Sequence, residues 1–116
     1  MQLHVKGKNL EVSDSIRSYA ERKLKKLDRQ VHELTQVEVE LAVEKNPSVA
    51  DNQIAEATVR MKGHTLRARE ATRDMKASID ELTEKLLRLV REEGDKKAAK
   101  RRIADKHLNG DVPVVE

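Results

Sequence analysis

The chain has 116 residues, enough for one domain with a modest hydrophobic core, and a net charge of +3. It contains no cysteine, which excludes a disulfide framework, a thiolate metal site and a cysteine nucleophile. Tyr19 is the only residue of the Phe, Tyr and Trp type, so stacking of RNA bases on a row of aromatic rings is excluded. Because the sequence shows neither a signal peptide nor an apolar run long enough to cross a bilayer, we expect a cytoplasmic protein without a membrane partner.

The beginning of the chain predicts a strand and a helix. Residues 2–8 alternate, with Leu3 and Val5 on one face, which is typical of a short strand. Ser13 is the expected N-cap of a helix that continues to about residue 30. The apolar stripe of this helix is formed by Ile16, Ala20, Leu24, Leu27 and Val31.

Three further segments alternate between apolar and polar residues and predict strands. They cover residues 35–45, 53–62 and 65–70, separated by a polar loop at 46–52 and a tight reversal at 63–64. Strands joined by such short connections form an antiparallel meander.

The outward faces of these strands carry charges. The acidic residues of the first of them are Glu38, Glu40 and Glu44. Arg60 and Lys62 on the next strand are expected to pair with them across the sheet. Arg67 and Arg69 have less obvious partners, and we expect them to extend a basic surface at the sheet edge.

A second helix is predicted from about residue 74 to 92, because apolar residues recur with helical spacing. They are Met75, Ile79, Leu82, Leu86 and either Leu89 or Val90. Gly94 is the expected C-cap. Residues 95–107 hold six Lys or Arg against two Asp, and we expect residues 95–116 to be a basic flexible extension beyond a folded domain of residues 1–94.

The predicted order is that of an α+β domain with β-α-β-β-β-α topology. The first two strands flank a helical crossover, so they are expected to be parallel neighbours in a four-stranded sheet. Each helix has one apolar stripe, and the sheet has one apolar face. Both helices are therefore expected to pack on the same face of the sheet.

The basic residues of the first helix form a stripe. In an α-helix, four basic residues fall within an arc of roughly 100° opposite the apolar residues: Arg22, Lys25, Lys26 and Arg29. Among them only Lys25, four residues after Glu21, has the spacing that favours an intrahelical ion pair. Because a row of cations suits a phosphate backbone, RNA binding is favoured over a purely solubilising role. Lys23 falls beside the apolar stripe, with its stem expected on the edge of the core.

The second helix offers fewer candidates, because acidic residues share its exposed side. Glu81 and Glu84 stand four residues before Lys85 and Arg88, which is the orientation of stabilising ion pairs. Arg88 and Arg91 lie beyond this acidic turn and are the better candidates for phosphate contacts.

Motifs for catalysis are missing from the sequence. The histidines are His4, His32, His64 and His107. They show neither metal-ligand spacing nor an obvious carboxylate partner, and no phosphate-cradling glycine loop or nucleophile motif occurs. We therefore predict no catalytic residue, no metal site and no cofactor.

Several short strings resemble one known family. They are Ile16-Arg17, KLKKL at 23–27, Asp74-Met75, Ile79-Asp80 and Lys85-Leu86. Together, and in this order, they are similar to the N-terminal domain of ribosome hibernation promoting factors, also called ribosome-associated translation inhibitors, over about residues 2–93. The resemblance implies a fold similar to double-stranded RNA-binding domains. It also implies a non-catalytic translation inhibitor that binds the small ribosomal subunit and its rRNA at the decoding region, blocking mRNA and tRNA in the mRNA channel and the A and P sites.

The resemblance also assigns residues. Family members have basic residues on both helices, and the residues of this chain at matching positions are Lys23, Lys26, Arg29, Lys85 and Arg88. Arg22 and Lys25 are further candidates, and Lys76 stands where family members usually have Tyr. Long members continue into a second domain that dimerises and pairs two ribosomes. No such domain is present here, and we expect the chain to be the N-terminal part of a long form.

Two other functions remain open at this point. A general double-stranded RNA-binding protein would bind an arbitrary duplex as well as it binds small subunits. A protein-interaction module would dock its charged helices on an acidic or helical partner, and its association would not depend on RNA.

Overall fold

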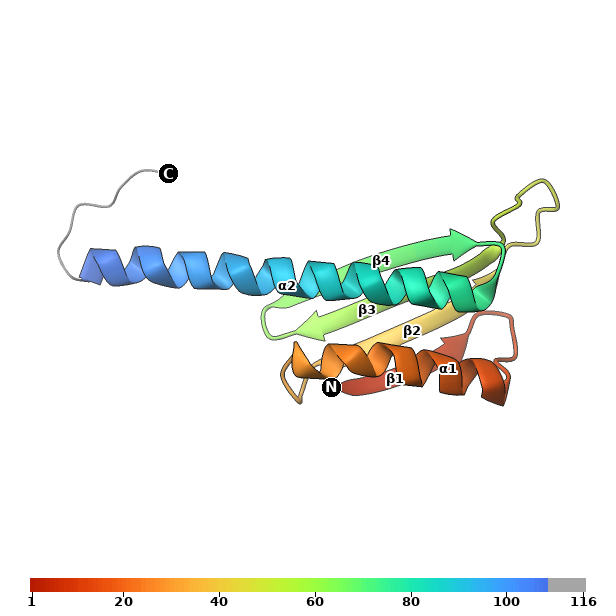
Figure 1. Ribbon diagram of the computed structural model, residues 1–116, viewed down its shortest axis with the longest axis horizontal. Coiled ribbons are helices and arrows are strands. Elements are labelled where there is room, and N and C mark those ends of the chain that lie inside the picture. The colour runs from red at the N-terminus through yellow and green to blue at the C-terminus, as the bar shows by residue number, and fades with distance from the viewer. Residues whose placement is uncertain (109–116) are drawn as a thin grey trace.

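One mixed sheet of four strands, in the order β1-β2-β3-β4, forms the base of the computed structural model (Figure 1). The structure describes the backbone of residues 1–108 and the side chains of residues 1–94. The strands are β1 (Gln2–Gly7), β2 (Gln36–Val43), β3 (Gln53–Met61) and β4 (His64–Thr72). β1 is parallel to β2, and the remaining neighbours are antiparallel. The predicted parallel pair and the meander that follows it are confirmed.

Both helical segments cover one face of this sheet, as the sequence predicts. The helices are α1 (Asp14–Leu24), the short 3-10 helix η1 (Lys25–Arg29) that continues it, and α2 (Met75–Leu108). Figure 1 shows α2 lying along β3 and β4, with α1 beside it on the β1 side of the sheet. The α+β class and the packing of both helices on one face are therefore confirmed.

The core lies between the helices and the sheet. Leu24 of α1, Val39 of β2 and Leu86 of α2 are all fully buried. Of the two alternatives at the end of the apolar stripe of α2, Val90 is buried and Leu89 is only partly buried. Full burial of such an aliphatic side chain contributes about 1.5–3 kcal/mol to stability. The apolar faces predicted from the sequence therefore supply most of the driving force for folding.

The first helix begins where the sequence predicts but changes its geometry near its end. Ser13 is the N-cap, and its Oγ accepts a hydrogen bond of 3.2 Å from the N–H of Ile16. A continuous α-helix to residue 30 is wrong, because η1 replaces its last turn. Leu24 and Leu27 are both fully buried and stand three residues apart. A 3-10 helix has three residues per turn, so it keeps both leucines pointing into the core.

The second helix is longer than predicted. Asp74 caps its beginning, with Oδ2 accepting a hydrogen bond of 3.1 Å from the N–H of Ala77. The helix passes through Gly94, which lacks the positive φ of a C-terminal cap, and ends at Leu108. The prediction that Gly94 ends the helix is therefore wrong. A domain boundary at residue 94 stays a prediction, and residues 109–116 of the expected extension lie outside the described residues.

The outer face of the sheet carries ion pairs that only partly match the expected ladder. Arg60 Nη1 lies 2.5 Å from Glu38 Oε1, which confirms this pair. Arg69 has a partner after all, since its Nε lies 3.3 Å from an oxygen of Glu56. Glu56 stands directly opposite Glu40 in the register, so Glu40 faces an acid on β3 and not a base. Glu40 instead pairs with Lys6 of β1, whose Nζ lies 3.8 Å from its carboxylate, so much of the charge on the sheet face is neutralised within that face.

Candidate nucleic-acid interface

A groove runs between the first helix and α2. It has a volume of about 250 Å³ and is lined by Lys23, Lys26, Asp80, Thr83 and Glu84. We call this groove the helix seam. Lys23 is partly buried, and its Nζ lies 3.7 Å from Asp80 Oδ1. The predicted position of Lys23 at the core edge is confirmed, but its charge is partly neutralised across the seam.

The 3-10 geometry of η1 divides the basic stripe that an ideal α-helix would form. Residues three apart are eclipsed in a 3-10 helix, so Lys26 aligns with Arg29, and Lys25 aligns with Asp28. Lys26 lines the helix seam. Asp28 lies on the other flank, where its carboxylate is 3.2 Å from the amino group of Met1. The prediction of a single stripe is therefore wrong for Lys25, which shares its flank with an acid, while Lys26 and Arg29 stay on one flank of η1.

The single tyrosine lies where α1 meets α2 and is surrounded by cations. The Tyr19 hydroxyl donates a hydrogen bond of 2.7 Å to Asp80 Oδ1. Three cationic groups lie close to the centre of the Tyr19 ring: Arg22 Cζ at 5.3 Å, Lys23 Nζ at 5.5 Å and Lys76 Nζ at 5.3 Å. We call these five residues the Tyr19 cluster. The hydrogen bond to Asp80, followed by partial burial and the Asp80 charge, raises the pKa of Tyr19.

Sequence reasoning did not find the Tyr19 cluster. Tyr19 and Asp80 are 61 positions apart, so no local spacing relates them. The one signal available was a lone aromatic residue, Tyr19, in a basic amphipathic helix. Lys76, which in the sequence is only a departure from the family pattern, lies near the same ring as Arg22 and Lys23.

The candidate residues of α2 lie on two different flanks. Arg88 and Arg91 are exposed and follow the seam residue Glu84 by four and seven positions, so they continue its face of the helix. Lys85 points the other way, with its Nζ 3.4 Å from an oxygen of Glu70 on β4. The structure thus groups Arg88 and Arg91 with the first helix and separates Lys85 from them.

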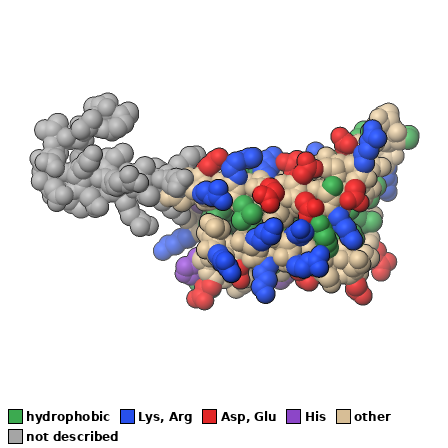
Figure 2. All heavy atoms as spheres, in the orientation of Figure 1, with side chains coloured by type: hydrophobic (Ala, Val, Ile, Leu, Met, Phe, Trp, Pro, Cys, Tyr) green, Lys and Arg blue, Asp and Glu red, His purple; other side chains and the backbone are tan. Residues whose placement is uncertain are grey.

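The charge on the helical face is uneven. Figure 2 shows Lys and Arg side chains gathered over the α1 half of this face, while acidic and basic side chains intermingle over α2. The positive charge of this face is therefore concentrated on the α1 side of the helix seam.

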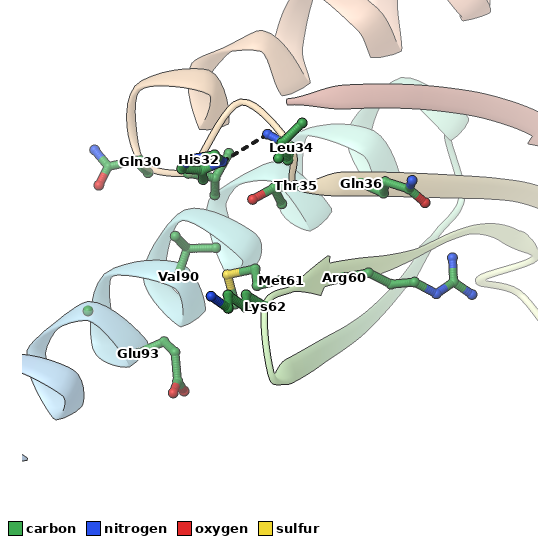
Figure 3. A pocket seen from close by; sticks show the side chains of 12 residues that line it. Gln30, His32, Leu34, Thr35, Gln36, Arg60, Met61, Lys62, Val90 and Glu93 are labelled. Carbon is green, nitrogen blue, oxygen red and sulfur yellow. Dashed lines mark hydrogen bonds between the residues drawn. The ribbon is translucent and has the colours of Figure 1, made fainter.

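A second hollow lies at the end of the sheet. This cleft of about 840 Å³ is formed by residues 30–36, the end of β3 and the turn of α2 at Val90 (Figure 3). Beside it, His64 Nε2 lies 2.8 Å from Glu93, a carboxylate partner that the sequence did not reveal. None of the predicted RNA contacts lines this cleft. Among the described residues there is no cluster of His, Asp or Glu that could hold a metal ion.

The fold and its cation-rich helical face define a small α+β domain suited to binding a polyanion. The chain belongs to the family described as sigma 54 modulation protein / S30EA ribosomal protein, whose model matches residues 3–98. This match confirms the family resemblance read from the sequence. None of the helices that the structure describes has the length and apolar character needed to cross a bilayer.

Individual relatives agree with this assignment. The ribosome hibernation promotion factor of Picosynechococcus is 35% identical over 102 residues, which cover 87% of this chain and 53% of that protein. The ribosome hibernation promoting factor of Salmonella typhimurium is 34% identical over 96 residues, covering 83% of this chain and 96% of that protein. Among solved structures, the Protein Y N-terminal domain of Thermus thermophilus has a TM-score of 0.66 and 32% identity, covering 78% of this chain and 96% of that one.

The chain spans about half the length of the longer curated relatives that it matches. Its similarity to double-stranded RNA-binding domains stays an expectation from the sequence.

Proposed function

We propose that this chain is a non-catalytic ribosome hibernation factor that binds the small ribosomal subunit. It binds rRNA at the decoding region and inhibits translation by blocking mRNA and tRNA in the mRNA channel and the A and P sites. Membership of the S30EA family, whose relatives are named as ribosome hibernation factors, is the observation that carries the proposal. The cation-rich helical face supplies a physical basis for contact with rRNA.

The proposed contacts follow the rims of the helix seam. Two of its lining residues, Asp80 and Glu84, are carboxylates, so we expect phosphates beside the cations and away from these acids. The residues proposed to contact rRNA there are Arg22, Lys23, Lys26, Arg29, Arg88 and Arg91. Lys25 and Lys85 share their flanks with Asp28 and Glu70, and we expect weaker contributions from them.

Inhibition in this proposal results from occlusion. Phosphate contacts position a protein on RNA without reading its sequence, so the shape of the rRNA determines where the domain binds. A rigid domain seated in the decoding region occupies space that mRNA and tRNA need. Binding should weaken steeply with salt, because each neutralised phosphate releases counterions.

The test compares two triple charge reversals. The seam variant carries Lys23→Glu, Lys26→Glu and Arg29→Glu. The matched control carries Lys45→Glu, Lys62→Glu and Arg67→Glu, three exposed positions away from the helix seam with the same change in charge. In sedimentation with purified small subunits, the seam variant should lose binding and the control should retain it, with thermal melting confirming that both are folded. Wild-type binding by the seam variant would contradict the proposed interface.

Two further measurements separate the proposal from its alternatives. Chemical footprinting of rRNA should show protection in the decoding region, and bound tRNA should compete with the chain. A general double-stranded RNA-binding protein would instead be displaced from small subunits by an equal amount of arbitrary duplex. Co-sedimentation that survives nuclease digestion of the rRNA would favour the protein-interaction module.

A further inference from the structure

We propose that the Tyr19 cluster is a binding site for one phosphodiester group of RNA. Arg22 and Lys76 contact the phosphate, while Tyr19, hydrogen-bonded to Asp80, is a positioning residue whose ring both cations approach. The inference deepens the proposed function and rests on it for the identity of the RNA. It adds Lys76, a residue that neither the sequence nor the family resemblance assigned to the interface.

The charges of the cluster do not balance. Three cationic side chains lie within 5.5 Å of the centre of the Tyr19 ring, and the cluster contains one carboxylate, Asp80. Asp80 already accepts the Tyr19 hydroxyl and pairs with Lys23. Within the described side chains, Arg22 and Lys76 form no ion pair, and both are exposed. Two of the three cations therefore have no carboxylate within ion-pair distance, although the Asp74 charge also acts on Tyr19.

Cations held around one ring repel one another, and the ring compensates only part of this repulsion. The negative face of a tyrosine attracts a cation by about 0.5–1 kcal/mol at exposed sites. An anion bound between Arg22 and Lys76 would reduce the repulsion and gain charge-assisted hydrogen bonds. A phosphodiester matches the site, because guanidinium offers a planar fork of donors and ammonium a compact point charge.

The position of the cluster suits a backbone that crosses both helices. Arg22 belongs to α1 and Lys76 to the first turn of α2, so one phosphate between them bridges the two elements. The hydrogen bond between Tyr19 and Asp80 joins the same two helices and limits their relative movement. A site whose donors are already in place loses less entropy when the ligand binds.

The experiment measures binding to purified small subunits as a function of salt, with the full chain. Each phosphate contact contributes roughly 0.7–0.9 to the slope of log K against log salt concentration. Lys76→Gln should therefore reduce this slope by about one and weaken binding several-fold at low salt. The matched control is Lys62→Gln, an exposed lysine in the β3–β4 turn, which should retain the wild-type slope. Arg22→Gln should behave like Lys76→Gln.

Tyr19→Phe distinguishes a positioning role from a direct contact. It keeps the ring but removes the hydroxyl, so affinity should fall while the salt slope stays at the wild-type value. Wild-type slopes in both Lys76→Gln and Arg22→Gln would overturn the site, even if the wild-type chain binds ribosomes.

A second measurement does not require ribosomes. The chain has one tyrosine, so the NMR signals of the Tyr19 ring are unambiguous. Titration with inorganic phosphate should shift them in the wild type and not in the double variant Arg22→Gln, Lys76→Gln. Such shifts in a chain that fails to bind ribosomes would support the anion site and overturn the proposed function. Identical shifts in the wild type and the double variant would overturn the site.

Discussion

The hydroxyl of Tyr19 in α1 donates a hydrogen bond of 2.7 Å to Asp80 Oδ1 in α2. The acceptor is a carboxylate, and such charge-assisted bonds are stronger than bonds between neutral groups. Because the two residues belong to the two helices that carry the proposed RNA contacts, this bond influences the spacing of the cations across the helix seam. It is therefore the first contact to test.

The titration of Tyr19 should report this contact directly. The hydrogen bond to Asp80, then partial burial, raises the pKa of Tyr19. Its ultraviolet absorbance should therefore titrate with a midpoint above the ordinary value of about 10. Since the pKa is higher in the folded than in the unfolded chain, the associated stability is complete below the unfolded pKa and is lost as pH rises through the folded pKa. Asp80→Ala should lower the midpoint, whereas the neighbouring Glu81→Ala should leave it nearly unchanged; equal midpoints in all three proteins would contradict the contact.

Two glycines should respond in opposite directions to substitution by alanine. Gly94 lies inside α2 with no atom close to an added Cβ, so Gly94→Ala should stabilise the helix by about 0.5–1 kcal/mol. Gly63 has φ of +72° in the β3–β4 turn, where alanine is strained. Gly63→Ala should lower the free energy of unfolding by about 1 kcal/mol. Thermal and denaturant unfolding measure the change in the free energy of unfolding for each variant. Destabilisation by Gly94→Ala would instead support a helix that ends at that residue.

Leu24 should be among the most sensitive core positions. It is fully buried at the junction of α1 and η1, so Leu24→Ala should cost about 2–5 kcal/mol through lost burial and a cavity. Leu34 is 68% exposed and provides the control with the same chemical change. Leu34→Ala should change stability by less than about 0.5 kcal/mol in urea unfolding. Comparable losses at the two positions would show that the core lies elsewhere.

The cross-strand pair of Glu38 and Arg60 should make a pH-dependent contribution to stability. The hydrogen bond from Arg60, reinforced by its charge, lowers the pKa of Glu38. Because the pKa is lower in the folded chain, the stabilisation is present above the unfolded pKa and is lost as pH falls through the folded pKa. Arg60→Gln should therefore unfold at a lower temperature than the wild type at neutral pH, and the difference should disappear in acid. A difference that persists in acid would assign it to packing and not to the ion pair.

Much of the fold could be predicted because its signals are local. The alternation around Val39 and the helical spacing of Ile79 and Leu86 are properties of neighbouring residues, and all three side chains are buried as expected. The candidate interface was predicted less completely. Lys26 and Arg29 remain together, but Lys25 was misplaced because an ideal helical wheel does not anticipate a 3-10 turn.

The order of the elements, the buried stripes and the concentration of cations on the first helix follow from the amino-acid sequence, since these depend on periodicities within single segments. Three contacts arise only from the packing of the folded chain: Tyr19 with Asp80, Lys76 with the ring that Arg22 also approaches, and Lys85 with Glu70. Each of these contacts joins two different elements. Their geometry depends on how helices and sheet pack, which no spacing along one segment encodes.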